Sequence, residues 1–110
     1  MNRLGAGAEV WMHNMENNHS EGHAFSVKFK CTKNMAEYVT LILGLQMVRK
    51  LGAKRASILG GSELIIKQIK GEYSLNNPRL SQYREAILDL IKDLLEIDFA
   101  AIPETEYASP

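Results

Sequence analysis

The sequence contains one cysteine, three prolines and no long apolar stretch. Because Cys31 has no second cysteine to pair with, an internal disulfide is excluded, and we expect a reducing, intracellular compartment, cytoplasmic or nuclear. The unbroken apolar runs are a few residues long, too short for a membrane-spanning helix, and residues 1–5 lack the apolar segment of a secretory signal. These absences favour an intracellular protein with no membrane partner, and 110 residues suit a single domain over 1–110.

An excess of charge of either sign is also lacking, since 13 Lys and Arg residues balance 13 Asp and Glu residues. The charges are nevertheless unevenly distributed. Seven bases lie between residues 26 and 55 beside one acid, Glu37, whereas seven acids lie between residues 85 and 106 beside one base, Lys92. One part of the surface therefore suits a polyanionic partner. Two solvated helix faces of opposite charge explain the same pattern equally well.

Alternation of apolar and polar side chains predicts a hairpin near the start of the chain. Ala8–His13 is rich in strand-forming residues, and Ala24–Lys30 places phenylalanine and valine on one face and serine and lysine on the other. The polar segment 14–22 between them is predicted to be a turn. Two further strands are expected at Arg55–Leu59 and Ile97–Ile102.

Three helices are expected between these strands, each with a residue at its start that suits an N-cap. Thr32 is predicted to cap a helix running to about residue 51, Ser62 a helix over 63–70, and Asn77 a helix running to about residue 95. The order of elements is then β-β-α-β-α-α-β. That order predicts an α/β fold in which an antiparallel hairpin joins a parallel unit.

Four segments resemble the ribonuclease H-like domain of plant retrotransposon polyproteins, the reverse-transcriptase-like family. They are Gly5–Ala8, Cys31–Tyr38 with Leu41–Leu45, Gly60–Gln68, and Gly71–Tyr73 followed by Asn77–Leu80. The most specific parts are Ala-Glu-Tyr at 36–38, and Gly-Glu-Tyr at 71–73 followed by Pro-Arg-Leu at 78–80. The resemblance implies a mixed sheet with helices packed on it. It also implies that the family's first strand is missing and that the domain is truncated at both ends.

The resemblance implies a chemistry in which four carboxylates hold two Mg²⁺ ions that cleave the RNA strand of an RNA–DNA hybrid. Glu37 matches the family's glutamate, whereas Gly61 stands where the family carries an aspartate. The two other aspartates are expected before Gly5 and beyond Pro103, outside the sequence. One ligand of four remains, so we expect no metal site, no bound cofactor and no nuclease activity.

Other candidate residues have simpler structural explanations. His19 and His23 are four residues apart, but they lie in a predicted turn without a third ligand, so a metal site is not expected. Trp11, Phe25 and Phe29 suit a base-stacking platform, although packing in a core beneath the hairpin explains them better.

Three lysines near the first helix are the candidate nucleic-acid contacts: Lys28, Lys30 and Lys33. The family binds its hybrid across the hairpin and the start of this helix, where lysines can contact phosphates without reading bases. Solvation and protection of a strand edge explain these lysines equally well. Glu37 likewise has a structural explanation, because an acid near the start of a helix is stabilised by the helix dipole.

The sequence thus supports a degenerate ribonuclease H-like domain that is catalytically inactive and binds RNA–DNA hybrid or another nucleic acid weakly. One alternative is a structural or protein-interaction module that self-associates; another is a fragment of an active two-metal enzyme, against which Gly61 counts. Without the family's central strand, either the hairpin pairs directly with Arg55–Leu59 or two chains share their open edges. We expect a homodimer.

Overall fold

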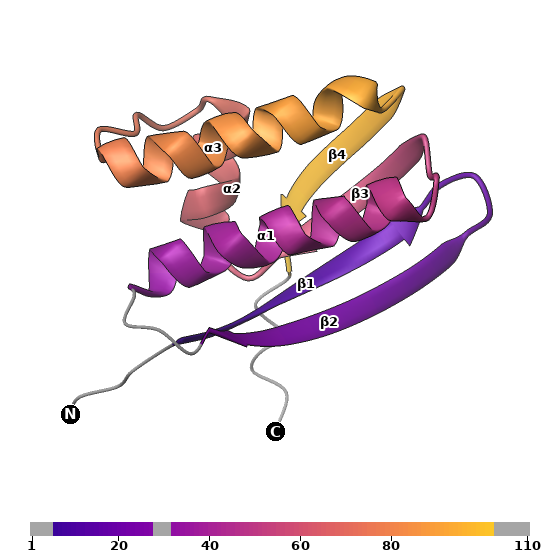
Figure 1. Ribbon diagram of the computed structural model, residues 1–110, viewed down its shortest axis with the longest axis horizontal. Coiled ribbons are helices and arrows are strands. Elements are labelled where there is room, and N and C mark those ends of the chain that lie inside the picture. Colours follow the sequence, from indigo (N-terminus) through magenta and orange to yellow (C-terminus); the bar gives the residue numbers. More distant parts are fainter. Residues whose placement is uncertain (1–5, 28–31, 103–110) are drawn as a thin grey trace.

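The computed structural model describes residues 6–27 and 32–102 (Figure 1). Along the chain the elements are β1 (Ala6–Asn14), β2 (His19–Val27), α1 (Lys33–Lys50), β3 (Arg55–Gly60), α2 (Glu63–Lys70), α3 (Pro78–Leu90), the 3₁₀ turn η1 (Ile91–Asp93) and β4 (Glu96–Ala101). This order confirms the predicted β-β-α-β-α-α-β fold. Within the described ranges, no helix has the length and apolar character needed to cross a membrane.

The four strands form one mixed sheet in the order β2-β1-β3-β4. β1 is antiparallel to both β2 and β3, with Val10 opposite Gly60, and β3 is parallel to β4. The hairpin therefore pairs directly with β3, the first of the two arrangements expected for a sheet without the family's first strand. Val10–Asn14 of β1 thereby pair with Ala56–Gly60 within one chain, so a second chain is not needed to pair these two strands.

The hairpin is longer than predicted, and its turn is shorter. β2 begins at His19, which pairs with Asn14, so the turn covers residues 15–18 instead of 14–22. The strand tolerates polar residues here because β2 is an edge strand with exposed positions along it. Asn18 takes the left-handed backbone conformation at φ 58° that closes the turn, a conformation that asparagine adopts more readily than most residues.

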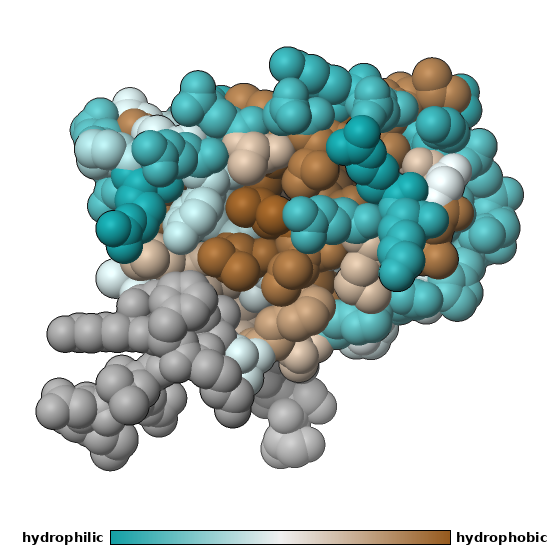
Figure 2. All heavy atoms as spheres, viewed as in Figure 1, coloured by the Kyte–Doolittle hydropathy of each residue, from teal (hydrophilic) through white to brown (hydrophobic). Residues whose placement is uncertain are grey.

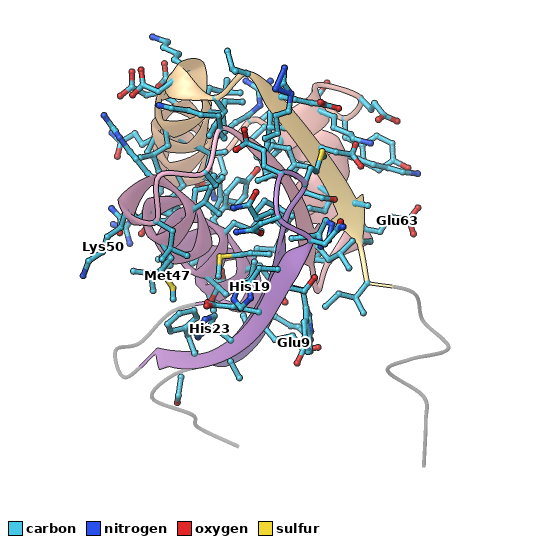
Figure 3. The ribbon with its side chains drawn as sticks, turned by 90° about the vertical axis from the view of Figure 1, so that its right-hand side faces the viewer. Glu9, His19, His23, Met47, Lys50 and Glu63 are labelled. Carbon is cyan, nitrogen blue, oxygen red and sulfur yellow. The ribbon has the colours of Figure 1, made fainter. Side chains whose placement is uncertain are left out.

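α1 and α3 lie on one face of the sheet (Figure 3). Val10 and Met12 of β1 point toward α1, and Gly44 lets the helix approach them, because a Cβ at Gly44 would lie 3.1 Å from a Val10 methyl group. Trp11 points to the opposite face and is 45% exposed. The expected core packing is therefore wrong for Trp11, whereas Phe25 packs against the core. Alternation along the hairpin puts the two side chains on different faces. Phe29 lies outside the described residues.

Apolar side chains are not confined to the buried side of α1. Figure 2 shows them gathered over α1 and the groove between α1 and α3, framed by polar residues. The core beneath contains Tyr38, Leu41, Leu45, Ile58, Ile65 and Ile87, all at most 2% exposed.

Each helix is capped as predicted. The side-chain oxygens of Thr32, Ser62 and Asn77 accept hydrogen bonds from backbone N–H groups in the first turns of α1, α2 and α3. α3 ends at Leu90, earlier than the expected residue 95. The chain leaves the helix there because the N–H groups of Leu95 and Glu96 donate to the Lys54 carbonyl, which aligns β4 with β3.

Candidate nucleic-acid interface

Glu37 lies in the second turn of α1 and is 4% exposed. Burial raises the pKa of its carboxyl group, and the nearby acid Glu9 raises it further. The Lys33 ammonium group and a hydrogen bond from the Gly61 backbone N–H act in the opposite direction, but burial prevails. In the described ranges no side chain forms a hydrogen bond or ion pair with this carboxylate.

The structure brings Glu37 and Gly61 together, as the resemblance implies. Gly61 follows the last residue of β3 and presents its backbone N–H to Glu37. A residue that the sequence analysis missed, Glu9 of β1, belongs to the same neighbourhood, because β1 pairs with β3 at Val10 and Gly60. Alternation along β1 marks Glu9 as a polar position, but only the register with β3 shows that it lies beside Gly61.

These groups do not fit the two Mg²⁺ ions that the fold family implies. Gly61 has no side chain, and in the part of the chain that the structure describes no three His, Cys, Asp or Glu residues converge to hold a metal ion. Mg²⁺ requires octahedral oxygen coordination and gives up its water reluctantly. Glu37 is a single carboxylate and leaves most of that coordination to water.

An open hollow lies over the start of α1, beside the hairpin. Lys33 and Glu37 line it from the helix; the strands contribute Gly7, Ala8, Glu9, Ala24 and Phe25. Lys33 is exposed and lies one helical turn before Glu37. Lys28 and Lys30, the other two predicted contacts, lie outside the described residues.

A second hollow lies between the starts of α1 and α3. The two helices run side by side in the same direction (Figure 1), so their N-termini lie at the same end of the molecule. Thr32, Asn34 and Met35 line the hollow from α1, and Asn77, Arg79 and Leu80 from α3. Helix N-termini carry partial positive charge and free N–H groups, so this end suits an anionic partner. The sequence analysis missed Asn34 and Arg79.

The other candidate residues lie away from this end of α1. His19 and His23 are on β2 instead of in a turn, and both ring Nε2 atoms lie 3.0 Å from oxygens of Glu21. His19 lines a pocket with Val48 and Leu51, at the end of α1, and Figure 3 shows both histidines on the side of the sheet that carries α1. Glu63 forms an ion pair with Lys67 at 3.1 Å, which explains it without a role at Gly61.

The mixed sheet, the helices on it and the position of Glu37 define a ribonuclease H-like domain. Ribonuclease H1 of the archaeon Halobacterium salinarum NRC-1 superimposes with a TM-score of 0.77 at 21% identity, over 96% of this chain and 81% of that one. The N-terminal ribonuclease H domain of Rv2228c from Mycobacterium tuberculosis gives 0.69 at 27% identity, over 93% and 76%. LC11-RNase H1, solved in complex with an RNA/DNA hybrid, gives 0.68 at 25%, over 94% and 78%.

The chain belongs to the reverse transcriptase-like family, which it matches over residues 2–106. The bifunctional protein Rv2228c of Mycobacterium tuberculosis is 33% identical over 74 residues, which make up 67% of this chain. An uncharacterized protein of Mycobacterium bovis, Mb2253c, matches to the same extent. The chain spans 20% of the length of these curated relatives.

Proposed function

We propose that this ribonuclease H-like domain binds RNA–DNA hybrid, or another nucleic acid, weakly and without sequence preference, and does not cleave it. The observation that carries the proposal is the neighbourhood of Glu37, where a glycine backbone takes the place of a second carboxylate. The LC11 protein, which shares the fold, binds an RNA/DNA hybrid. In this chain, retained binding and lost cleavage are separable because they depend on different groups.

Binding is supported by the charge at the start of α1. Lys33 and Arg79 are exposed, and they flank the converging N-termini of α1 and α3. Such groups contact phosphate oxygens, whose positions do not depend on base sequence. The expected affinity is that of non-specific binding, with a dissociation constant of about 1–100 µM at physiological salt.

Fluorescence anisotropy with a labelled RNA–DNA hybrid tests the binding. We expect affinity to fall steeply as salt is raised, and the Lys33→Ala and Arg79→Ala variants each to reduce the slope of log K against log salt by about one. Lys92→Ala is the matched control. Lys92 is an exposed lysine in η1, at the opposite end of α3, where it pairs with Asp89. Absence of binding at low salt, or equal losses in all three variants, would contradict the proposal.

A cleavage assay with Mg²⁺ tests the second half of the proposal. We expect no cut product from the wild-type chain, and none from Gly61→Asp, because restoring one carboxylate beside a buried glutamate does not assemble a two-metal site. Cleavage by the wild-type chain that is lost in Glu37→Gln would overturn the proposed inactivity.

A further inference from the structure

β2 is the terminal strand of the sheet, and its outer edge differs from that of β4. Edge strands are normally protected against pairing by charges, prolines, bulges or short length. β4 carries the exposed acids Glu96 and Asp98 over six residues. β2 has nine residues paired one to one with β1, without a bulge or a proline, and its only acidic or basic residue besides histidine is Glu21. Among the described strands, β2 is the edge that lacks such protection.

We infer that β2 is a homodimer interface, where the β2 strand of a second copy pairs antiparallel about a twofold axis at Gly22. The polar side chains of β2 favour this register. In the chain, Glu21 lies between His19 and His23, and all three share one face of the strand. Pairing centred on Gly22 places Glu21 opposite His23 of the second copy, and His23 opposite the second Glu21. An imidazole that faces a carboxylate across a strand pair can donate a hydrogen bond to it, whereas like charges in facing positions destabilise the pair.

The other face of the strand also suits this register. The Trp11 ring rests directly on Gly22, because a Cβ at Gly22 would lie 2.6 Å from three ring atoms. In the dimer, the two copies of β1 are three strand spacings apart, about 14 Å. Each Trp11 ring lies over its own β2 strand, one strand spacing closer to the twofold axis than β1. The two rings are then about 5 Å apart, within the range of aromatic pairs. Glycine at the axis provides room for both rings, and the partner covers a tryptophan that is 45% exposed in the single chain.

The resulting assembly is a continuous eight-stranded sheet. Because the twofold axis is perpendicular to the sheet, the helices of both copies lie on the same face. The surface at the start of α3 stays clear of the interface, since α3 packs on α1 and reaches β4 through η1, at the other edge of the sheet. Arg79 is therefore clear of the dimer contact, whereas the hollow that contains Lys33 is lined in part by Ala24 and Phe25 of β2.

Sedimentation equilibrium of the 110-residue chain tests the inference. We expect a concentration-dependent mass approaching twice 12.4 kDa. His23→Glu places two carboxylates opposite each other, and Glu21→Lys removes the carboxylate that faces His23, so each should raise the dissociation constant at least tenfold. The double variant Glu21→Lys/His23→Glu places a lysine opposite a glutamate in the same register and should return the constant to within threefold of wild type. Asp98→Lys, on the β4 edge, is the control and should change it little.

Two further measurements distinguish loss of the dimer from loss of the fold. Circular dichroism at low concentration should be the same for all variants. The emission of Trp11, the sole tryptophan, should shift to longer wavelength as the wild-type dimer is diluted.

In a Cys31→Ser background, a mixture of Ser20→Cys and Ala24→Cys chains should form the mixed disulfide, because these positions face each other across the axis. Two copies of position 20 are offset by four residues, about 13 Å, and should not crosslink.

The inference is overturned if the folded wild-type chain stays monomeric at the highest concentration tested. It is also overturned if a dimer forms but neither single charge variant weakens it, or if Ser20→Cys chains crosslink to one another as readily as to Ala24→Cys. Either of these two outcomes would place the contact on another surface, such as the apolar side of α1.

Discussion

The Glu37 carboxyl group occupies surroundings that favour its neutral form. It is almost fully buried, Glu9 is close, and the groups that favour the charged form are one lysine a helical turn away and one backbone N–H. In a catalytic site, metal ions would compensate such burial. Here burial prevails and the pKa is raised. The charged form of Glu37 therefore lowers the free energy of unfolding, by an amount that depends on pH.

Replacing Glu37 by glutamine should remove that effect. Because the pKa is raised on folding, the folded state binds more protons than the unfolded state at pH values above 4.5, the unfolded-state pKa. Wild-type stability should therefore fall as pH rises from 4.5 through the folded-state pKa, whereas Glu37→Gln should lack this decline. Urea unfolding from pH 3.5 to 8 should show the variant to be the more stable protein at pH 7 and the two to be alike below pH 4. Asp98→Asn, at an exposed position, serves as the control; a Glu37→Gln protein less stable than wild type at pH 7 would contradict the argument.

The buried pair Tyr38 and Gln68 joins α1 to α2. The Tyr38 hydroxyl donates to Oε1 of Gln68 at 2.9 Å, and burial raises the pKa of this tyrosine to about 12. We expect Tyr38→Phe to lower the free energy of unfolding by about 1–3 kcal/mol, because the buried Gln68 oxygen is left without its donor. The double variant Tyr38→Phe/Gln68→Leu should recover most of that loss in urea unfolding, since no buried polar group is then unpaired. If the double variant is less stable than Tyr38→Phe alone, the hydrogen bond is not the cause.

At the level of elements, the helices could be predicted more closely than the hairpin. Thr32, Ser62 and Asn77 mark helix starts because a cap depends on a few neighbouring residues, which the sequence shows directly. The limits of β2 depend on its partner. His19 and Ser20 are ordinary turn residues by composition, yet they belong to a strand because β1 continues opposite them to Asn14.

The packing of α1 on β1 depends on the absence of a side chain at Gly44. A Cβ there would lie 3.1 and 3.3 Å from the Val10 methyl groups and 3.6 Å from the Met12 sulfur. We expect Gly44→Leu to reduce the free energy of unfolding by about 1–3 kcal/mol, since the larger side chain forces α1 away from the sheet. Gln46→Leu is the control, at an exposed position of the same helix, and should leave the urea midpoint nearly unchanged. Equal effects of the two substitutions would show that the close approach is unimportant.

At the level of the whole molecule, the sequence left two ways to close the sheet, and the structure has one of them. Alternation along a strand shows which face is buried, but it does not show which strand lies alongside. The pairing of β1 with β3 could not be predicted for this reason. The candidate site was only partly predictable for the same reason. The resemblance implied that Glu37 and Gly61 lie together, whereas the proximity of Glu9 depends on the register of β1 on β3.

Hydrogen exchange tests the central position of β1. With partners on both sides, all backbone N–H groups of Val10–Asn14 should be protected, whereas alternate groups of β2 should exchange freely in the dissociated chain. Measurement on the Glu21→Lys variant at low concentration isolates the single chain, and the wild-type chain at high concentration should gain protection in β2. Rapid exchange at every second position of β1 would show that β3 is not its neighbour.

The β1–β3 pairing also determines when in folding the sheet is completed. Its paired residues are 42 to 50 positions apart in the chain, whereas the hairpin closes through a four-residue turn within about 1–10 µs. During synthesis at about 5–20 residues per second, β1 waits for several seconds before β3 exists. Throughout that delay the inner edge of the hairpin lacks its partner. During this delay the unpaired inner edge is the part of the hairpin most open to pairing with another chain.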